Sequence, residues 1–207
     1  MLALTDAAVS WDLELDRIRH RLAGRAAAQH LSPDVTRRAA VATILRPSVS
    51  GDRADTEVLL IRRAERVGDP WSGHMAFPGG REDPVDRDLF ATALRETREE
   101  VGVDLDQHEY LGQLDELPAI ARGQFAGMVI APYVFALRGE PRLTTNEEVA
   151  EVVWASLGQM ARGEVDDIKE LTYEGQLRRL PAYRVQDRVV WGLTHLMLRN
   201  LLSLVER

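Results

Sequence analysis

One segment, residues 80–102, constrains this chain of 207 residues more than any other. It ends in RETREEVG, residues 95–102, where three glutamates fall within five positions: Glu96, Glu99 and Glu100. At about 100° per residue these glutamates gather on one side of a helix. The residues that gather on the opposite side are Phe90, Leu94, Thr97 and Val101. The segment therefore predicts an amphipathic helix with a buried apolar stripe and an acidic stripe.

The three carboxylates are a candidate metal site. Like charges at this spacing repel each other by about a few tenths of a kcal/mol per pair on an isolated helix, and a bound cation removes the repulsion. Oxygen ligands alone favour Mg²⁺ or Mn²⁺, and the absence of cysteine and of paired histidines argues against zinc. The alternative is an ordinary charged, solvent-exposed helix face.

A turn precedes this helix. Pro78, Gly79 and Gly80 follow a short apolar stretch, and glycine there allows the backbone to approach a ligand closely and to direct a carbonyl at a metal ion. The acidic spacer REDPVD, residues 81–86, comes next. A glycine pair, an acidic spacer and RExxEExG together are much rarer than any one of them.

This combination resembles the Nudix box, in which Gly, five residues, Glu and seven residues precede R-E-U-x-E-E-x-G-U, where U is apolar. Residues 95–103 fill the second half in register, with Thr97 a departure at an apolar position. The first half is one residue longer, so Asp86 is aligned with the Glu position. The resemblance implies a Nudix-type α/β/α sandwich with a mixed β-sheet.

The upstream sequence is similar to the coenzyme A pyrophosphatase branch of that family. The matching residues are Leu59, Leu60, Arg63, Ala64, Gly73 and Phe77. The second arginine of that pattern is displaced, because Val67 stands at its position and Arg66 beside it. Near the C-terminus, Trp191, Gly192 and Thr194 match the helix start of the same branch, although core packing is the more common role for such a tryptophan.

The resemblance implies a hydrolase of a nucleoside diphosphate derivative that requires Mg²⁺ or Mn²⁺. It implies catalytic roles for four residues, Glu96, Glu99, Glu100 and Arg95. The glutamates would be metal ligands, with the Gly80 carbonyl as an additional ligand. Arg95 would pair with one of the glutamates and fix its side-chain conformation. Further candidates for substrate contact are Arg63, Glu147 and Glu148. His74 is expected to face solvent.

Three functions stay open at this point. The leading hypothesis is cleavage of coenzyme A, or one of its derivatives, to 3′,5′-ADP and 4′-phosphopantetheine. The displaced arginine keeps ADP-ribose, a dinucleotide or a nucleoside triphosphate open as the substrate. A Nudix module that only binds nucleotides is the third alternative, and the intact glutamates argue against it. Dimers are common in the family, so a homodimer is also an open alternative.

Composition excludes several classes of protein. The net charge of −7 is unsuited to sequence-independent binding of nucleic acid, so a nucleic-acid partner is not expected. The chain lacks cysteine, and the sequence shows neither a signal peptide nor an apolar run of about 18 residues that could span a membrane. A cytoplasmic protein without a membrane partner is therefore expected.

The length supports one domain with a small extension. We expect a helical extension at residues 1–35, with a helix over residues 5–30, and the Nudix domain at residues 36–207. Strands are predicted over residues 39–45, 57–62, 109–114, 128–137, 149–157 and 183–190, the first two as a hairpin-like pair around the turn-forming residues 47–55. Besides the acidic helix, helices are predicted over residues 159–162 and 193–205.

Overall fold

The computed structural model describes residues 15–50, 53–68, 71–121, 124–173 and 175–205. Its larger sheet consists of β1 (Arg37–Ser50), β2 (Arg53–Arg63), β3 (Met75–Ala76), β4 (Gly79–Arg81), β5 (Glu109–Gln113), β6 (Leu117–Ala121), β7 (Gln124–Ala136) and β8 (Val149–Ser156). A smaller sheet consists of β9 (Asp166–Tyr173), β10 (Gln176–Val185) and β11 (Arg188–Trp191). The helices are residues 15–22, α2 (Leu89–Val101), the 3₁₀ turn η1 (Leu105–Gln107), α3 (Leu157–Ala161) and α4 (Gly192–Ser203).

The larger sheet is mixed, as predicted. Its strand order is β3-β2-β1-β7-β5, with β4 paired to β1, β6 to β7 and β8 to β2. β1 runs parallel to β7 and antiparallel to β2 and β4. The predicted hairpin of the first two strands is confirmed. Both strands continue into the segment that the sequence suggested was a turn, up to Ser50 and from Arg53.

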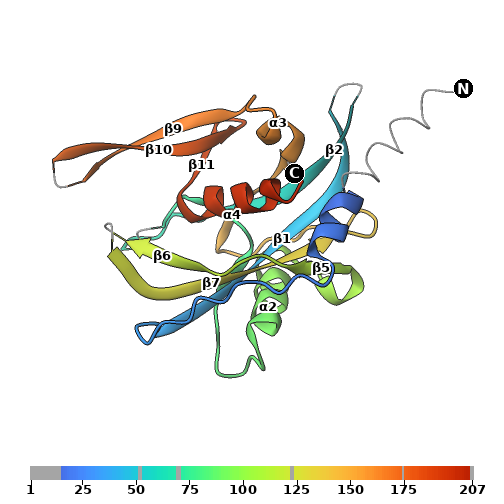
Figure 1. Ribbon diagram of the computed structural model, residues 1–207, viewed down its shortest axis with the longest axis horizontal. Helices are drawn as coiled ribbons and strands as arrows, with labels where there is room; N and C mark the ends of the chain where they lie inside the picture. Colours follow the sequence, from blue (N-terminus) through green and yellow to red (C-terminus); the bar gives the residue numbers. More distant parts are fainter. Residues whose placement is uncertain (1–14, 51–52, 69–70, 122–123, 174, 206–207) are drawn as a thin grey trace, which may run out of the picture.

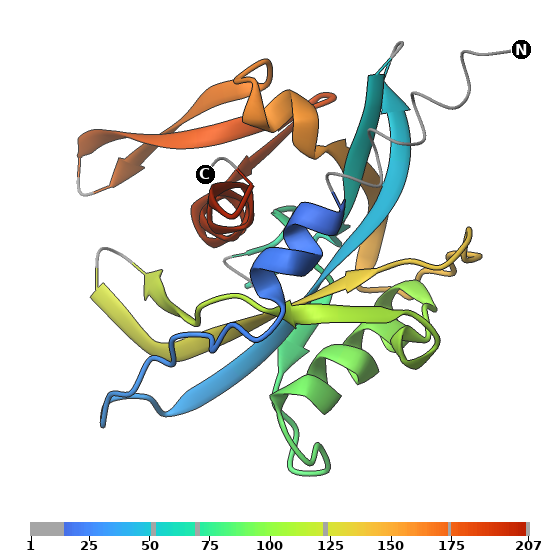
Figure 2. The same cartoon turned by 45° about the vertical axis from the view of Figure 1, so that its right-hand side comes forward.

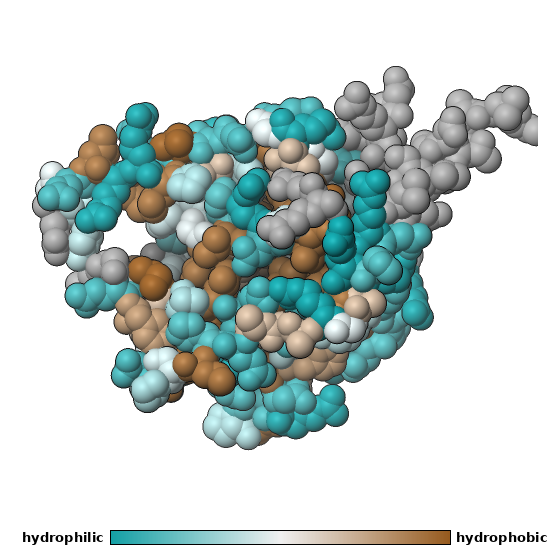
Figure 3. All heavy atoms as spheres, in the orientation of Figure 1, coloured by the Kyte–Doolittle hydropathy of each residue, from teal (hydrophilic) through white to brown (hydrophobic). Residues whose placement is uncertain are grey.

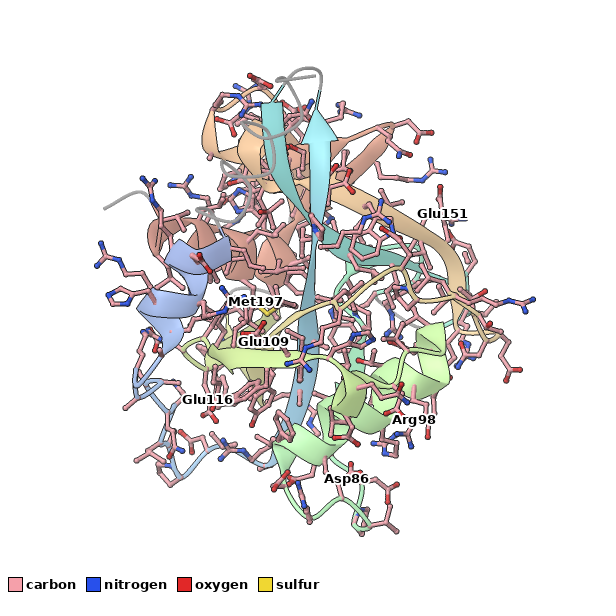
Figure 4. All side chains as sticks on the ribbon, turned by 90° about the vertical axis from the view of Figure 1, so that its right-hand side faces the viewer. Asp86, Arg98, Glu109, Glu116, Glu151 and Met197 are labelled. Atoms are coloured by element: carbon pink, nitrogen blue, oxygen red, sulfur yellow. The ribbon has the colours of Figure 1, made fainter. Side chains whose placement is uncertain are left out.

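Helices cover both faces of this sheet (Figures 1 and 2). Alternate side chains of β1 and β2 point to opposite faces, as the strand period of two requires. One core lies under α2 and includes Ile44, Leu59 and Ile61. The other lies under α4 and the N-terminal helix and includes Leu60 and Met197, and Figure 4 shows Met197 between α4 and the sheet. The α/β/α layering is therefore present.

The N-terminal helix ends earlier than predicted. Residues 1–14 lie outside the described residues, and the described helix runs over residues 15–22. Gly24 has a φ of 70°, and the amide of Arg25 donates to the Leu22 carbonyl at 3.1 Å. A glycine in this left-handed conformation ends a helix because an L side chain is strained there. The prediction of helix up to residue 30 is thus wrong.

The C-terminal third differs most from the prediction. Residues 183–190 form two strands, because Gln186, with a φ of 54°, turns the chain between β10 and β11.

The strands β3, β4, β6 and β9 were not predicted. β9 and β10 extend as a two-stranded ribbon past the N-terminal end of α4 (Figure 1). In the space-filling view, apolar side chains show at the surface over α4, below that ribbon (Figure 3).

The remaining predicted elements are confirmed with small shifts of their ends. The acidic helix is α2, the predicted short helix is α3, and the final helix is α4. Among the described residues, no helix combines the length and the apolar character needed to span a membrane.

Candidate active site

Helix α2 is held firmly at both ends. The Asp88 side chain accepts a hydrogen bond from the Ala91 amide at 2.8 Å and so caps the N-terminus. Gly102, with a φ of 73°, ends the helix, and the Thr144 amide donates to the Val101 carbonyl at 3.0 Å. Figure 4 shows Asp86 below the first turn of α2 and Arg98 near its other end. The glutamates of RETREEVG therefore project from a fixed frame.

Glu100 lies on the buried side of α2 and is only 2% exposed. This position corrects the prediction of an acidic stripe opposite the apolar one. One carboxylate oxygen accepts a hydrogen bond from the Gly79 amide at 2.8 Å. Burial, reinforced by the nearby charge of Glu96, raises the pKa of Glu100 to about 8. A carboxylate in this setting is strongly stabilised by a cation.

Glu96 lies beside the second glycine of the turn. A Cβ atom built on Gly80 would be 2.4 Å from the carboxylate carbon of Glu96, so a side chain at position 80 would displace the Glu96 carboxylate. Burial also raises the pKa of Glu96, while the neighbouring Arg95 guanidinium opposes that shift. Glu96 and Glu100 therefore form a partly desolvated pair of carboxylates at the glycine turn of β4.

Arg95 organises this acidic surface. Its Nη1 atom donates to Glu96 at 2.9 Å and to Glu99 at 3.2 Å. Its Nε and Nη2 atoms donate to the two carboxylate oxygens of Asp86, both at 2.9 Å. The predicted pairing of Arg95 with glutamates of the segment is thus present.

Asp86 is a site residue whose role the sequence analysis missed. The hydrogen bonds from Arg95 hold the pKa of this carboxyl well below its usual range, and the side chain is 4% exposed. Thr92 adds a hydrogen bond from its hydroxyl at 2.9 Å. The signal was available, because Asp86 was aligned with the acidic position of the pattern. Glu99, in contrast, is 54% exposed.

The two acidic residues of the 144–148 loop behave differently. The charge of Glu148 raises the pKa of both Glu96 and Glu100, so Glu148 is within electrostatic reach of the pair. Its side chain bonds to Arg66 at 3.0 Å, and its carbonyl accepts from the Ala64 amide at 2.8 Å. Glu147 is exposed to solvent.

The segment that carries Arg63 adjoins both the acidic pair and the start of α4. The positive charge of Arg63 lowers the pKa of Glu100, and the Arg63 amide donates to the His74 carbonyl at 3.0 Å. The His74 ring packs edge-on against Trp191 at 5.0 Å, so His74 is half-buried rather than solvent-facing. Thr194 at the start of α4 donates from its hydroxyl to the Met75 carbonyl at 3.1 Å.

The donor set fits a hard divalent ion. Two partly desolvated carboxylates, Glu96 and Glu100, lie at a backbone turn without a Cβ at Gly80, burial raises the pKa of both, and the charge of Glu96 raises that of Glu100 further. Within the described part of the chain, no three acidic or histidine side chains converge as a ready metal cluster. Arg95 and the Gly79 amide hold the carboxylates in other hydrogen bonds. Mg²⁺ commonly uses one or two carboxylates and completes its shell with water and phosphate oxygens.

Comparisons with known proteins identify the family of this chain. The family model of the NUDIX domain matches residues 36–174. A protein of Schizosaccharomyces pombe described as uncharacterized is 33% identical over 92% of this chain, and the match spans 62% of that protein's own length. An uncharacterized Nudix hydrolase of Photorhabdus laumondii, NudL, is 32% identical over 72% of this chain and 77% of its own.

Solved structures show the same fold at low sequence identity. A MutT/nudix family protein from Enterococcus faecalis matches 94% of this chain and 70% of its own, with a TM-score of 0.53 and 19% identity. A mutT/nudix family protein from Listeria innocua matches 83% of this chain and 94% of its own, with a TM-score of 0.53 and 13% identity. With a family model that covers most of the chain and a relative above 30% identity, this protein belongs to the Nudix family.

Proposed function

We propose that this protein is a Mg²⁺- or Mn²⁺-dependent pyrophosphohydrolase of coenzyme A or its derivatives, releasing 3′,5′-ADP and 4′-phosphopantetheine. One observation carries the choice of substrate. The two segments that resemble the coenzyme A branch, far apart in the sequence, contact each other, and Arg63 of the first acts on Glu100 through its charge. Thr194 of the second segment bonds to Met75, between Gly73 and Phe77 of the first.

Glu96 and Glu100 would hold the metal, with Glu99 and the Gly80 carbonyl as additional ligands. The ion would offset the charge of the diphosphate and lower the pKa of a bound water molecule. Arg95 sets the position of Glu96, and Asp86 in turn fixes the guanidinium. This support matters because a shift of about 1 Å in a reacting group can reduce the rate by about 100-fold.

Arg63 and Glu148 are proposed to contact the substrate or its metal ion. Both act electrostatically on Glu100, Arg63 lowering its pKa and Glu148 raising it. Glu147 is the weaker candidate, because it is exposed and its neighbour already faces the pair.

The test compares hydrolysis of coenzyme A, ADP-ribose and diadenosine polyphosphates with Mg²⁺ and with Mn²⁺, with products identified by mass. Preferential, metal-dependent release of 4′-phosphopantetheine supports the proposal. Preferential hydrolysis of another substrate would be consistent with the proposed metal-dependent hydrolysis and would show that coenzyme A is not the preferred substrate. Binding without hydrolysis of any substrate would favour the nucleotide-binding alternative.

A further inference from the structure

The sequence contains a single lysine, Lys169, and the structure places it against an aromatic ring. Lys169 lies on β9, and its Nζ atom is 5.9 Å from the centre of the Trp191 ring at the end of β11. Both side chains are half-buried. Cation–π contacts extend to about 6 Å, so this ammonium group is near the limit of the attraction and can reorient toward a better partner.

Two carboxylates near Lys169 on the same strand are engaged by arginines. Asp167 pairs with Arg184 at 2.6 Å, and Glu170 pairs with Arg179 at 3.1 Å. No carboxylate within the described part of the chain forms an ion pair with Lys169. A half-buried ammonium without a carboxylate partner attracts an anion, because its charge is only partly screened by water.

Lys169 is linked to the acidic pair by consecutive contacts. Trp191 packs against His74 at 5.0 Å, and the His74 carbonyl accepts from the Arg63 amide at 3.0 Å. Arg63 acts on Glu100 through its charge. The lysine is therefore connected to the acidic pair through one aromatic pair and one strand end.

The position of Trp191 is fixed by the chain that follows it. Gly192 has a φ of 64°, a conformation that disfavours an L side chain and turns β11 into α4. The hydroxyl of Thr194 then anchors the first turn of α4 to the Met75 carbonyl. An anion at Lys169 would consequently meet a preorganised apolar ring on one side.

We propose that Lys169 and Trp191 form a second anion subsite, which binds a phosphate monoester that the substrate carries away from its diphosphate. Lys169 supplies the point charge, and Trp191 supplies an apolar surface for the adjoining sugar or base. This inference rests on the proposed function, because the 3′-phosphate of coenzyme A is such a group. It makes Lys169 a residue that determines specificity.

The kinetic test compares coenzyme A with dephospho-coenzyme A, which lacks only the 3′-phosphate. The Lys169→Gln variant should reduce the ratio of the two kcat/KM values by about tenfold, the size expected for one hydrogen bond to a charged group. Arg179→Gln is the matched control, since it removes the same charge from the same hairpin at an exposed, carboxylate-paired position. This control should leave the ratio unchanged. An unchanged ratio in Lys169→Gln would overturn the inference while coenzyme A hydrolysis stands.

A binding test separates the inference from the proposed function. Adenosine 3′,5′-bisphosphate and AMP are titrated into the wild type and Lys169→Gln by calorimetry in the presence of a chelator. Tighter, Lys169-dependent binding of the bisphosphate supports the subsite even if coenzyme A is not hydrolysed, in which case only the proposed function fails. Equal binding of the two nucleotides overturns the subsite.

Chemical labelling provides an independent readout on the unmodified protein. Because Lys169 is the only lysine, an amine-reactive reagent can modify one side chain besides the N-terminus, and peptide mass spectrometry separates the two. Adenosine 3′,5′-bisphosphate should protect Lys169 from labelling, and AMP should not. Labelling of Lys169 at the same rate with both nucleotides would contradict the proposal.

Discussion

Arg95 donates hydrogen bonds from Nε and Nη2 to the two carboxylate oxygens of Asp86, both at 2.9 Å. The pair joins the loop before α2 to the helix face that carries the glutamates, and the same guanidinium reaches Glu96 from its remaining nitrogen. Forked pairs of this kind fix geometry in addition to contributing energy. The orientation of a candidate metal ligand thus depends on an aspartate outside the helix.

Asp86→Asn should lower both stability and activity. The substitution replaces a nearly buried carboxylate with a neutral group, and we expect a loss of about 1 to 3 kcal/mol in the free energy of unfolding. Urea unfolding measures the loss of stability, and steady-state hydrolysis measures the loss of activity. Asp86→Glu is the matched variant, which keeps the charge on a longer side chain and should retain most of both properties. Equal losses in the two variants would show that the charge is not what Arg95 requires.

Glu100→Gln should abolish most of the metal-dependent activity. The amide keeps the shape of the side chain and removes the charge, so we expect a fall in kcat of about 100-fold or more. Steady-state hydrolysis over a Mg²⁺ titration provides the measurement. Asp106→Asn, which removes an exposed charge just after α2, is the control and should be near wild type. Full activity in Glu100→Gln would refute its role as a ligand.

The metal-free protein should become less stable as the pH rises. The folded-state pKa of Glu100 is about 8, above the usual 4.5, so the folded state binds this proton more tightly than the unfolded state. The stabilisation is fully present below about pH 4.5 and is lost as the pH rises through 8, by at most about 1.4 kcal/mol per pH unit.

Urea unfolding in a chelator at several pH values between 5 and 9 tests this dependence. Glu100→Gln should flatten the profile, because the titrating group is removed. Added Mg²⁺ should restore stability at high pH in the wild type. The lowered pKa of Asp86 acts in the opposite direction, and its stabilisation is lost only in acid, outside this range.

The two glycines of the turn should respond differently to alanine. At Gly79 the φ is 152°, and a Cβ would lie 2.3 Å from the Ala40 carbonyl oxygen, so Gly79→Ala should destabilise the fold. At Gly80 a Cβ would meet the end of the flexible Glu96 side chain, so Gly80→Ala should reduce activity with little loss of stability. Thermal unfolding and kcat, measured on both variants, distinguish the two effects. If one of the two variants lost more of both stability and activity than the other, these separate roles of Gly79 and Gly80 would be contradicted.

Glu148→Gln should reduce activity more than Glu147→Gln. Glu148 acts electrostatically on both carboxylates of the pair, whereas Glu147 is exposed. The Mg²⁺ concentration at half-maximal rate should rise in the Glu148 variant, because a negative charge near the ion is lost. A larger effect at Glu147 would reverse the assignment of these neighbours.

Local residue patterns in the sequence were sufficient to predict the strongly periodic helices and strands, including the helix that bears the glutamates. The helix that carries Glu96, Glu99 and Glu100, the first hairpin and the final helix follow from residue spacing, because the energies that select them act between near neighbours in the chain. The family and the mixed sheet followed from the resemblance. The short strands β3 and β4 were missed, since two or three residues carry no period and are strands only through their partners β2 and β1.

Only the tertiary structure decided how each acidic residue is used. Glu99 and Glu100 are adjacent and chemically identical, yet one is 54% exposed and the other 2% exposed with a raised pKa. That difference comes from the packing of α2 on the sheet, which buries Glu100 and brings it to the amide of Gly79, 21 residues earlier. Burial and electrostatic environment depend on groups distant in the sequence, and for the same reason the meeting of Lys169, Trp191 and His74 could not be seen before the chain was folded.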